Sequence, residues 1–243
     1  MPLLAGVTGR QANNTPQNTM KKRLAALLIP AATLLPAAAF AAPCDTAMDK
    51  HAPTPLMYSV FRGDALNVRC LLDAGAKVNA TNGFGGTALG AAAFSGRTDI
   101  ARLLIERGAQ VDAADEGGIT ALMLAAGGGH TDTVRLLIDK GAQVDAADKN
   151  GFTALMLATY EGRADAARLL IDKGAQVNVL NRGGDTALMF AAGEGRPDIA
   201  RLLIDKGAQL NIANKHGNTA LTLAVRVGHT EIVQMLRAAG AKE

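Results

Sequence analysis

The amino-acid sequence predicts an all-α fold, a solenoid of six helix-turn-helix units of 33 residues with projecting hairpin loops. The nonapeptide Arg-Leu-Leu-Ile-Asp-Lys-Gly-Ala-Gln occurs three times, at 135–143, 168–176 and 201–209. A threonine recurs at the same interval, at positions 54, 87, 120, 153, 186 and 219. Self-similarity at a fixed period of this length is the signature of stacked repeats. One copy cannot bury its own apolar face, so neighbouring copies need the same core residues at the same phase.

The first element of each unit is a short, alanine-rich segment that follows the recurring threonine. Threonine is a preferred N-cap because its hydroxyl accepts a hydrogen bond from a free N–H group of the first helical turn. We therefore expect a helix between the threonine and the glycine nine residues later, where a helix end often requires a positive φ. These glycines lie at 63, 96, 129, 162, 195 and 228.

The second element is a helix that starts after this glycine and ends at the glycine of a recurring Gly-Ala pair. Pro197 suits the first turn of a helix, where a missing N–H costs nothing. Leu-Leu-Ile supplies the apolar stripe. Acidic residues that complement the helix dipole occur at Asp99, Asp132, Asp165, Asp198 and Glu231. A polar segment with Asp and Asn residues suited to turns then predicts the hairpin-like loop. In this interpretation the nonapeptide packs the stack and carries no chemistry.

Three motifs identify the repeat type. Asp-x-x-Gly-x-Thr-Ala-Leu-x-Leu-Ala occurs at 115–125 and 148–158, Gly-His-Thr-Asp at 129–132, and Leu-Leu-Ile-x-x-Gly-Ala recurs in the second helices. The pattern resembles the ankyrin repeat, which implies six repeats at 49–81, 82–114, 115–147, 148–180, 181–213 and 214–243. The family's Thr-Pro-Leu-His is Thr-Ala-Leu-Met in three copies and Thr-Pro-Leu-Met at 54–57. In the family, the histidine of this motif takes part in a hydrogen-bonding network. Because this chain lacks that histidine, we expect looser hairpins.

The N-terminal region has the three parts of a secretory signal peptide at 20–41. Met20-Lys21-Lys22-Arg23 is basic, residues 24–40 are apolar, and Ala39-Phe40-Ala41 is a small-x-small cleavage site. We expect cleavage after Ala41 or Ala42, an over-called start at 1–19, and export to a bacterial periplasm. The alternative is an uncleaved anchor, because the apolar run of 17 residues is at the lower limit for a span.

The net charge depends on this leader. Residues 1–41 contain four basic and no acidic residues, so their removal leaves 21 basic and 22 acidic residues and a net charge of −1. The basic isoelectric point of the whole chain, about 9.0, therefore belongs to the leader and gives no support for nucleic-acid binding.

Two cysteines, Cys44 and Cys70, follow the leader. An exported chain meets an oxidising compartment, and terminal repeats need a cap. We expect a Cys44–Cys70 disulfide that holds 42–48 as a capping segment over the N-terminal end of the stack. The alternative is that Cys70 is a buried small hydrophobe, because it replaces the inward-pointing leucine of the other copies. At the other end, copy six is expected to cap itself, helped by Gln234 and Arg237.

The positions at which the copies differ are where function is expected. In ankyrin-like stacks the hairpin tips and the exposed side of the first helix form a concave recognition surface. The matching positions give these candidate partner-binding residues: Phe61, Arg62, Phe84, Phe94, Ile119, Lys149, Phe152, Tyr160, Glu161, Arg182, Lys215 and Arg226. Five of the seven aromatics that follow the leader are among them, and exposed aromatic clusters commonly mark protein interfaces. The alternative is that the rings pack on neighbouring hairpins and stiffen the stack. Gly127-Gly128 is interpreted as a flat spot for a partner backbone or as drift.

No enzyme, cofactor or metal site is predicted. The four histidines lack metal-ligand spacing, and neither a nucleophile motif nor a phosphate loop is present. The pairs Asp112/Asp115 and Asp145/Asp148 lack the alternating ligands of an EF-hand, which favours turn capping over calcium. We expect a monomer that binds another protein in the periplasm, with no nucleic acid and no membrane after signal cleavage.

The resemblance extends to exported bacterial proteins that sometimes support a partner enzyme, such as a catalase in oxidative-stress defence. A rival hypothesis is an inhibitor or immunity protein that blocks a toxic enzyme. An enzyme of unknown type would require acids such as Glu161 and Glu194 to titrate abnormally in a pocket.

Overall fold

The computed structural model describes residues 54–242, and the helices in that range are all α-helical segments of the predicted repeats. The described part contains twelve helices and no strand, so the predicted all-α solenoid is confirmed. The predicted signal peptide at 20–41, the predicted capping segment at 42–48 and Cys44 lie outside the described residues. No helix in the described range has the length and apolar character needed to cross a bilayer.

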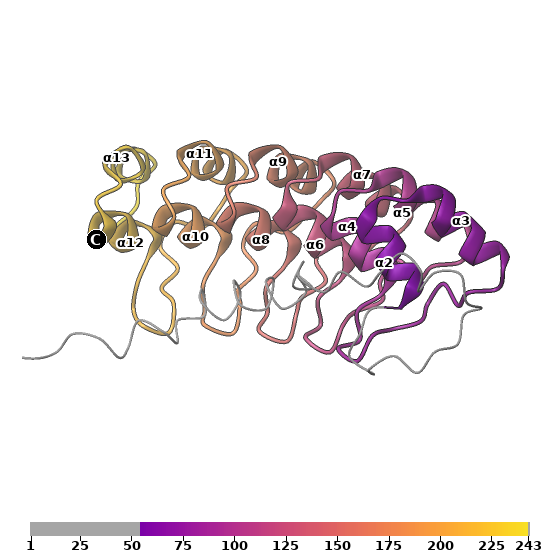
Figure 1. Ribbon diagram of the computed structural model, residues 1–243. Helices are drawn as coiled ribbons and strands as arrows, with labels where there is room; N and C mark the ends of the chain where they lie inside the picture. Colours follow the sequence, from indigo (N-terminus) through magenta and orange to yellow (C-terminus); the bar gives the residue numbers. More distant parts are fainter. Residues whose placement is uncertain (1–53, 243) are drawn as a thin grey trace, which may run out of the picture. The chain divides into compact units, whose positions relative to one another are not determined.

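Each copy contributes two helices that form two rows (Figure 1). The first helices follow the recurring threonine and are α2 (Pro55–Arg62), α4 (Ala88–Phe94), α6 (Ala121–Gly128), α8 (Ala154–Tyr160), α10 (Ala187–Gly193) and α12 (Ala220–Val227). The second helices are α3 (Ala65–Asp73), α5 (Thr98–Glu106), α7 (Thr131–Asp139), α9 (Ala164–Asp172), α11 (Pro197–Asp205) and α13 (Thr230–Ala238). Hairpin loops project beyond the row of first helices (Figure 1).

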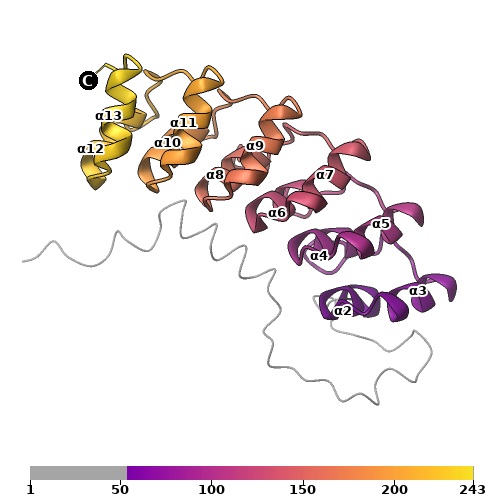
Figure 2. The ribbon, with the colours of Figure 1, turned by 90° about the horizontal axis from the view of Figure 1, so that it is seen from above.

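Adjacent copies pack through equivalent helices. Each first helix contacts the first helix of the next copy, each second helix contacts the next second helix, and the two helices of one copy pack together. Viewed from above, the helix pairs follow one another in chain order, with the first helices along one side (Figure 2). The hairpin loops therefore follow one another along one side of the described stack (Figure 1).

The threonine N-caps are confirmed in all six first helices. In α8, for example, the Thr153 hydroxyl accepts a hydrogen bond from the Met156 N–H at 3.4 Å. An N-cap of this kind contributes about 1 kcal/mol. The second helices from α5 to α13 have no side-chain cap and instead carry an acidic residue in the first turn, beside the positive end of the helix dipole.

The helix-ending glycines are also confirmed. The glycine nine residues after each threonine has a φ between 63° and 86°, and the glycine of each Gly-Ala pair has a φ between 83° and 94°. Side chains with a Cβ rarely adopt this conformation, so glycine is the residue that lets the chain reverse at both places.

The core is built from small residues in the first helices and leucines in the second. The alanines that line α4, α6 and α8 are almost fully buried, which lets the helix backbones approach closely. Leu104, Leu137, Leu170 and Leu203 occupy the same position in successive second helices, and each is 0% exposed. Three of these leucines belong to the repeated nonapeptide, which confirms its packing role.

Candidate functional site

The hairpins of consecutive copies are joined tip to tip by backbone hydrogen bonds. The Glu116 N–H donates to the Phe84 carbonyl at 3.0 Å, and the Lys149 N–H donates to the Gly117 carbonyl at 2.9 Å. The same bond recurs from Arg182 to Asn150 at 2.8 Å and from Lys215 to Gly183 at 2.9 Å. Glu116, Lys149, Arg182 and Lys215, here called the tip residues, thus share one backbone geometry while their side chains differ.

Within each hairpin, one Asp or Asn side chain holds the turn. Asp148 Oδ1 accepts from the N–H groups of Asn150 at 2.7 Å and Phe152 at 2.8 Å. The equivalent pair of bonds is made by Asn82, Asp115, Asn181 and Asn214. The prediction that Asp115 and Asp148 stabilise turns is therefore confirmed.

The other acid of each predicted pair bonds to the next copy. Asp112 Oδ1 accepts from the Gln143 N–H at 2.9 Å, and Asp145 Oδ1 accepts from the Gln176 N–H at 3.0 Å. Each carboxylate thereby satisfies a backbone donor across a copy boundary. Within residues 54–242, no group of three or more His, Cys, Asp and Glu side chains is arranged to hold a metal ion.

The hairpins also approach each other closely at a glycine. An ideal Cβ on Gly151, which has a φ of 82°, would lie 2.9 Å from the Cα of Asn181 in the next hairpin. Gly118 and Gly184 face the next hairpin backbone in the same way. The side of the hairpins that faces the neighbouring copy is therefore fixed by backbone packing, which leaves the tips to vary.

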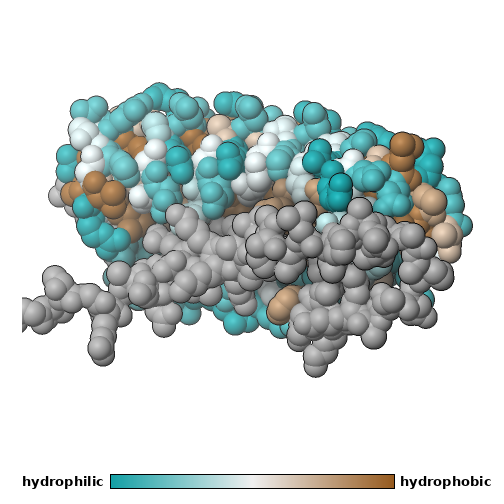
Figure 3. Space-filling model, in the orientation of Figure 1, coloured by the Kyte–Doolittle hydropathy of each residue, from teal (hydrophilic) through white to brown (hydrophobic). Residues whose placement is uncertain are grey.

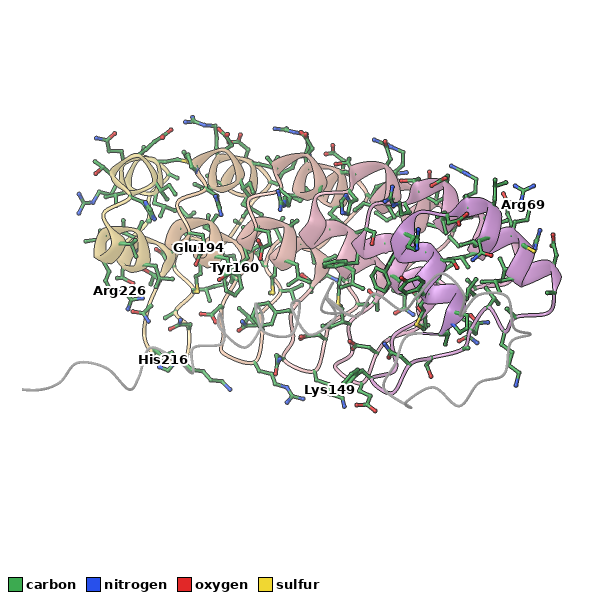
Figure 4. The ribbon with its side chains drawn as sticks, in the orientation of Figure 1. Arg69, Lys149, Tyr160, Glu194, His216 and Arg226 are labelled. Atoms are coloured by element: carbon green, nitrogen blue, oxygen red, sulfur yellow. The ribbon has the colours of Figure 1, made fainter. Side chains whose placement is uncertain are left out.

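The predicted partner-binding residues differ widely in exposure. Arg62, Phe84, Lys149, Arg182, Lys215 and Arg226 are exposed. Phe61, Phe94, Ile119 and Glu161 are partly buried. Phe152 and Tyr160 are only 6% and 5% exposed. Figure 4 shows Lys149 and His216 on the projecting loops and Arg226 on α12.

The expectation that Phe152 and Tyr160 face solvent is wrong. The Phe152 ring centroid lies 5.4 Å from that of Phe190, and the Tyr160 ring meets Phe190 edge-on at 6.1 Å. Phe190 belongs to α10, so the three rings join copies four and five. Aromatic pairs at such distances contribute about 0.5–1.5 kcal/mol beyond the area they bury. For these two residues the alternative holds, because the rings stiffen the stack.

Burial also changes the chemistry of this cluster. It raises the pKa of the Tyr160 phenol above the ordinary tyrosine value, and the negative charges of Glu194 and Glu161 raise it further, whereas Arg196 acts in the opposite direction. Figure 4 shows Tyr160 and Glu194 close together. The phenol is therefore neutral at physiological pH.

A row of basic residues that contact the preceding copy was not anticipated from the sequence. His130 Nε2 lies 2.9 Å from the Phe94 carbonyl, and Arg163 Nε donates to the Gly127 carbonyl at 3.2 Å. Both carbonyls lie at the C-terminal end of a first helix, where they have no partner within the helix. The signal was available, because a basic residue directly follows the glycine at 96, 129, 162, 195 and 228.

This row also explains one of the two extra glycines of copy three. An ideal Cβ on Gly128 would lie 2.6 Å from the His130 ring. Gly128 therefore makes room for the imidazole, an explanation that neither the flat-spot hypothesis nor the drift hypothesis includes.

The repeated nonapeptide adds ion pairs to its packing role. Lys173 Nζ lies 2.8 Å from Asp139 Oδ1, and Lys206 Nζ lies 3.0 Å from Asp172 Oδ1. The Asp of one copy thus pairs with the Lys of the next, and Arg107 and Asp73 do the same at 2.7 Å. The hydrogen bond from Lys173 lowers the pKa of the Asp139 carboxyl. The interpretation that this segment carries only packing is therefore incomplete.

Cys70 is not the buried small hydrophobe that one of the two expectations describes. Its thiol is free and its side chain is exposed, so it is not the buried hydrophobe of the alternative hypothesis. The equivalent Leu136, Leu169 and Leu202 are buried, because a middle copy has a neighbour on each side. Cys44 lies outside the described residues, so the Cys44–Cys70 disulfide stays a prediction.

The C-terminal end of the described stack is less polar than expected. Gln234 and Arg237 are exposed as predicted. Val225 and Val227 on α12 are also 52% and 53% exposed, and Figure 3 shows hydrophobic surface at this end. The self-capping prediction for copy six is thus only partly met.

Comparison with protein-family models identifies the repeat. A family model described as ankyrin repeats, in three copies, matches residues 24–115, 109–181 and 177–242, and these ranges include every described residue. No curated protein matches the chain.

Proposed function

The chain belongs to the ankyrin repeat family, whose repeats are protein-interaction modules, and from that premise we propose that it binds its partner through the hairpin tips and the adjoining ends of the first helices. The proposed surface comprises the tip residues together with the exposed Arg62, Phe84 and Arg226. Phe152 and Tyr160 are left out of this surface because their side chains are buried.

One observation carries this proposal, namely that the scaffold repeats while the surface does not. The caps, the tip-to-tip hydrogen bonds and the buried leucines recur from copy to copy. The side chains that this scaffold presents at the tips are Glu, Lys, Arg and Lys in successive copies. Stability requires the shared bonds but not a particular tip side chain, so the variation is available for recognition.

The finer proposal concerns place and partner. Residues 20–41 have the composition of a signal peptide, which supports export to the periplasm of a bacterium. There the module would support a stress-defence enzyme, as the resemblance to exported ankyrin-repeat proteins implies. The family's repeats serve as binding scaffolds, so catalysis is assigned to the partner and not to this chain.

Affinity capture from periplasmic extract tests the binding surface. The bait is the full chain in three forms: wild type, an Arg62→Ala/Phe84→Ala/Arg226→Ala variant, and an Arg102→Ala/Arg135→Ala/Arg168→Ala control that alters the exposed second-helix side. We expect one protein to be retained by the wild type and the control and lost with the first variant, with unchanged circular dichroism. Equal retention by all three forms contradicts the proposed surface.

The retained protein then separates the support role from the rival inhibitory role. If it is an enzyme, its activity or half-life under oxidative stress should rise when the purified chain is added. A stoichiometric loss of activity would instead favour the inhibitor or immunity role. Export is tested separately by cell fractionation and N-terminal sequencing, which should find a mature chain that begins at Ala42 or the residue after it.

A further inference from the structure

Three consecutive hairpins present a cation at the same structural position. Lys149, Arg182 and Lys215, here called the tip cations, follow one another in copies four, five and six. Their N–H groups make the equivalent bond to the preceding hairpin, at 2.9, 2.8 and 2.9 Å. All three side chains are exposed, and Figure 4 shows Lys149 at the end of its loop, away from the helices. The three charges thus form a row with one charge per copy.

Within the described residues, the tip cations lack the acidic partners that several second-helix cations have. Across the second helices, Lys173, Lys206 and Arg107 pair with carboxylates of the preceding copy at 2.7–3.0 Å. No such pair involves the tip cations within the described residues.

The acids beneath the tips are already engaged. The Asp148 carboxylate accepts two backbone N–H groups. The Asp185 carboxylate accepts the side-chain amides of Asn181 at 3.1 Å and Asn214 at 2.6 Å. These carboxylates hold the hairpins, and no ion pair within residues 54–242 joins them to the tip cations.

We propose that the tip cations bind an extended, acidic peptide segment whose carboxylates lie three residues apart. This inference rests on the proposed function and names the chemistry of the partner at that surface. Neighbouring packed helices lie about 8–10 Å apart, which sets the spacing of the copies. An extended polyproline-type chain rises about 9 Å over three residues and returns to the same face. Acidic side chains at every third residue therefore match the row in register.

A polynucleotide is the less favoured occupant of the same row. Binding of single strands combines a cationic groove with exposed aromatic rings on which bases stack. In copies four and five the rings of Phe152 and Tyr160 are buried against Phe190. The half-exposed Phe84 lies in copy two, next to the acidic tip residue Glu116. Beside the tip cations the one exposed aromatic ring in the described residues of these hairpins is the imidazole of His216, so a row of stacking rings is lacking.

Fluorescence anisotropy with two labelled peptides of equal composition tests the proposal. The first is (Glu-Pro-Ala)₃, with its three glutamates evenly spaced, and the second has the three glutamates consecutive. Each is titrated with the full chain, with a Lys149→Gln/Arg182→Gln/Lys215→Gln variant, and with the matched control Arg102→Gln/Arg135→Gln/Arg168→Gln. The three arginines of the control are also exposed, so both variants lose the same charge.

We expect the tip variant to bind the spaced peptide about tenfold more weakly than wild type, since three exposed charge pairs each contribute a fraction of a kcal/mol. The control should bind it as wild type does, and the consecutive peptide should bind more weakly than the spaced one. Equal binding by the tip variant and wild type overturns the proposal, and so does equal binding of the two peptides. A single-stranded oligonucleotide that binds wild type more tightly than the spaced peptide also overturns it.

This experiment uses purified protein and needs no natural partner, so its outcome is independent of the capture experiment. If the wild type binds the two peptides equally but still retains a partner in the affinity capture, only the acidic-peptide proposal is refuted. If the wild type prefers the spaced peptide but captures no partner, the tip cations remain a site for acidic peptides, and the proposed function of binding a periplasmic partner protein is refuted.

Discussion

The two long edges of the stack use the same repeat but treat charge in opposite ways. Along the second-helix edge, copies two to five share most of their residues, and an Asp of one copy pairs with an Arg or Lys of the next at three copy boundaries. Along the hairpin edge, the backbone bonds repeat while the side chains vary and the tip cations have no acidic partner in the described ion pairs. The first edge is engaged in holding the stack together, and the second is open to another molecule.

The aromatic residues repeat this contrast on a smaller scale. Phe84 and Phe152 occupy related hairpin positions, yet Phe84 is 50% exposed and Phe152 is 6% exposed. Phe84 stands three residues before its repeat threonine and Phe152 one residue before, and Phe152 packs on Phe190, a ring of copy five. An aromatic at a variable position therefore counts as a candidate for binding only after its exposure in the folded stack is known.

The largest effect expected from breaking this contrast is that of Phe152→Ala. Removal of a buried phenylalanine costs about 3–5 kcal/mol through lost burial and the cavity left behind. Phe84→Ala is the matched control and should cost under about 1 kcal/mol, because half of its ring is already in water. Urea denaturation followed by circular dichroism gives both values. Similar losses for the two variants would mean that Phe84 is as structural as Phe152.

A second, smaller effect is expected from adding a methyl group at a hairpin glycine. Gly151→Ala meets a positive φ and also the backbone of the next hairpin at 2.9 Å, so we expect a loss of about 2–3 kcal/mol. Gly141→Ala meets a φ of 91° but no atom within 4 Å, and its loss should be about 1 kcal/mol. The difference between the two unfolding free energies isolates the contact between hairpins. Equal losses would show that adjacent hairpins can move apart to accept the methyl group with no further loss of unfolding free energy.

How much of this follows from the sequence depends on how local the cause is. The threonine caps and the helix-ending glycines are fixed within one copy, and the leucine stripe is fixed by contacts between equivalent positions of adjacent copies, so the period of 33 residues reveals all three. The burial of Tyr160 depends on Phe190 of the next copy, which occupies a different repeat position. Periodicity aligns equivalent positions but does not show which non-equivalent side chains meet, so the aromatic cluster was predicted as surface.

The basic residues at 130 and 163 escaped prediction for a related reason. Each serves a carbonyl of the preceding copy, at Phe94 and at Gly127. A histidine and an arginine at equivalent positions look like unrelated loop residues until the shared acceptor is seen. The common requirement is a donor long enough to cross the copy boundary, and several residue types meet it.

A third prediction concerns pH and distinguishes the buried ring from an exposed one. In a Tyr58→Phe variant Tyr160 is the only tyrosine left, so the absorbance near 295 nm reports the ionisation of its phenol. Burial and two nearby carboxylates raise the pKa of Tyr160. The absorbance should therefore change at a pH above the ordinary midpoint of about 10. A raised folded-state pKa means that the stability from the neutral phenol is complete below pH 10 and is lost as the pH rises through the folded pKa. A midpoint equal to that of the urea-unfolded chain would place the phenol in water.

The smallest effect is expected on the second-helix edge, at Asp139. Its hydrogen bond with Lys173 lowers the carboxyl pKa, so the stability it adds is present above about pH 4 and is lost as the pH falls through the lowered folded value. The pair is exposed to solvent and screened by salt. Asp139→Asn should therefore shift the urea midpoint less than Gly141→Ala at neutral pH and low salt. The shift should shrink further at about pH 3 or in high salt. The Asp139→Asn substitution should also leave binding of the spaced acidic peptide unchanged, because the second-helix edge is not the binding edge. A large loss of stability, or a change in peptide binding, would mean that the two edges are coupled and that the paired charges do more than join neighbouring copies.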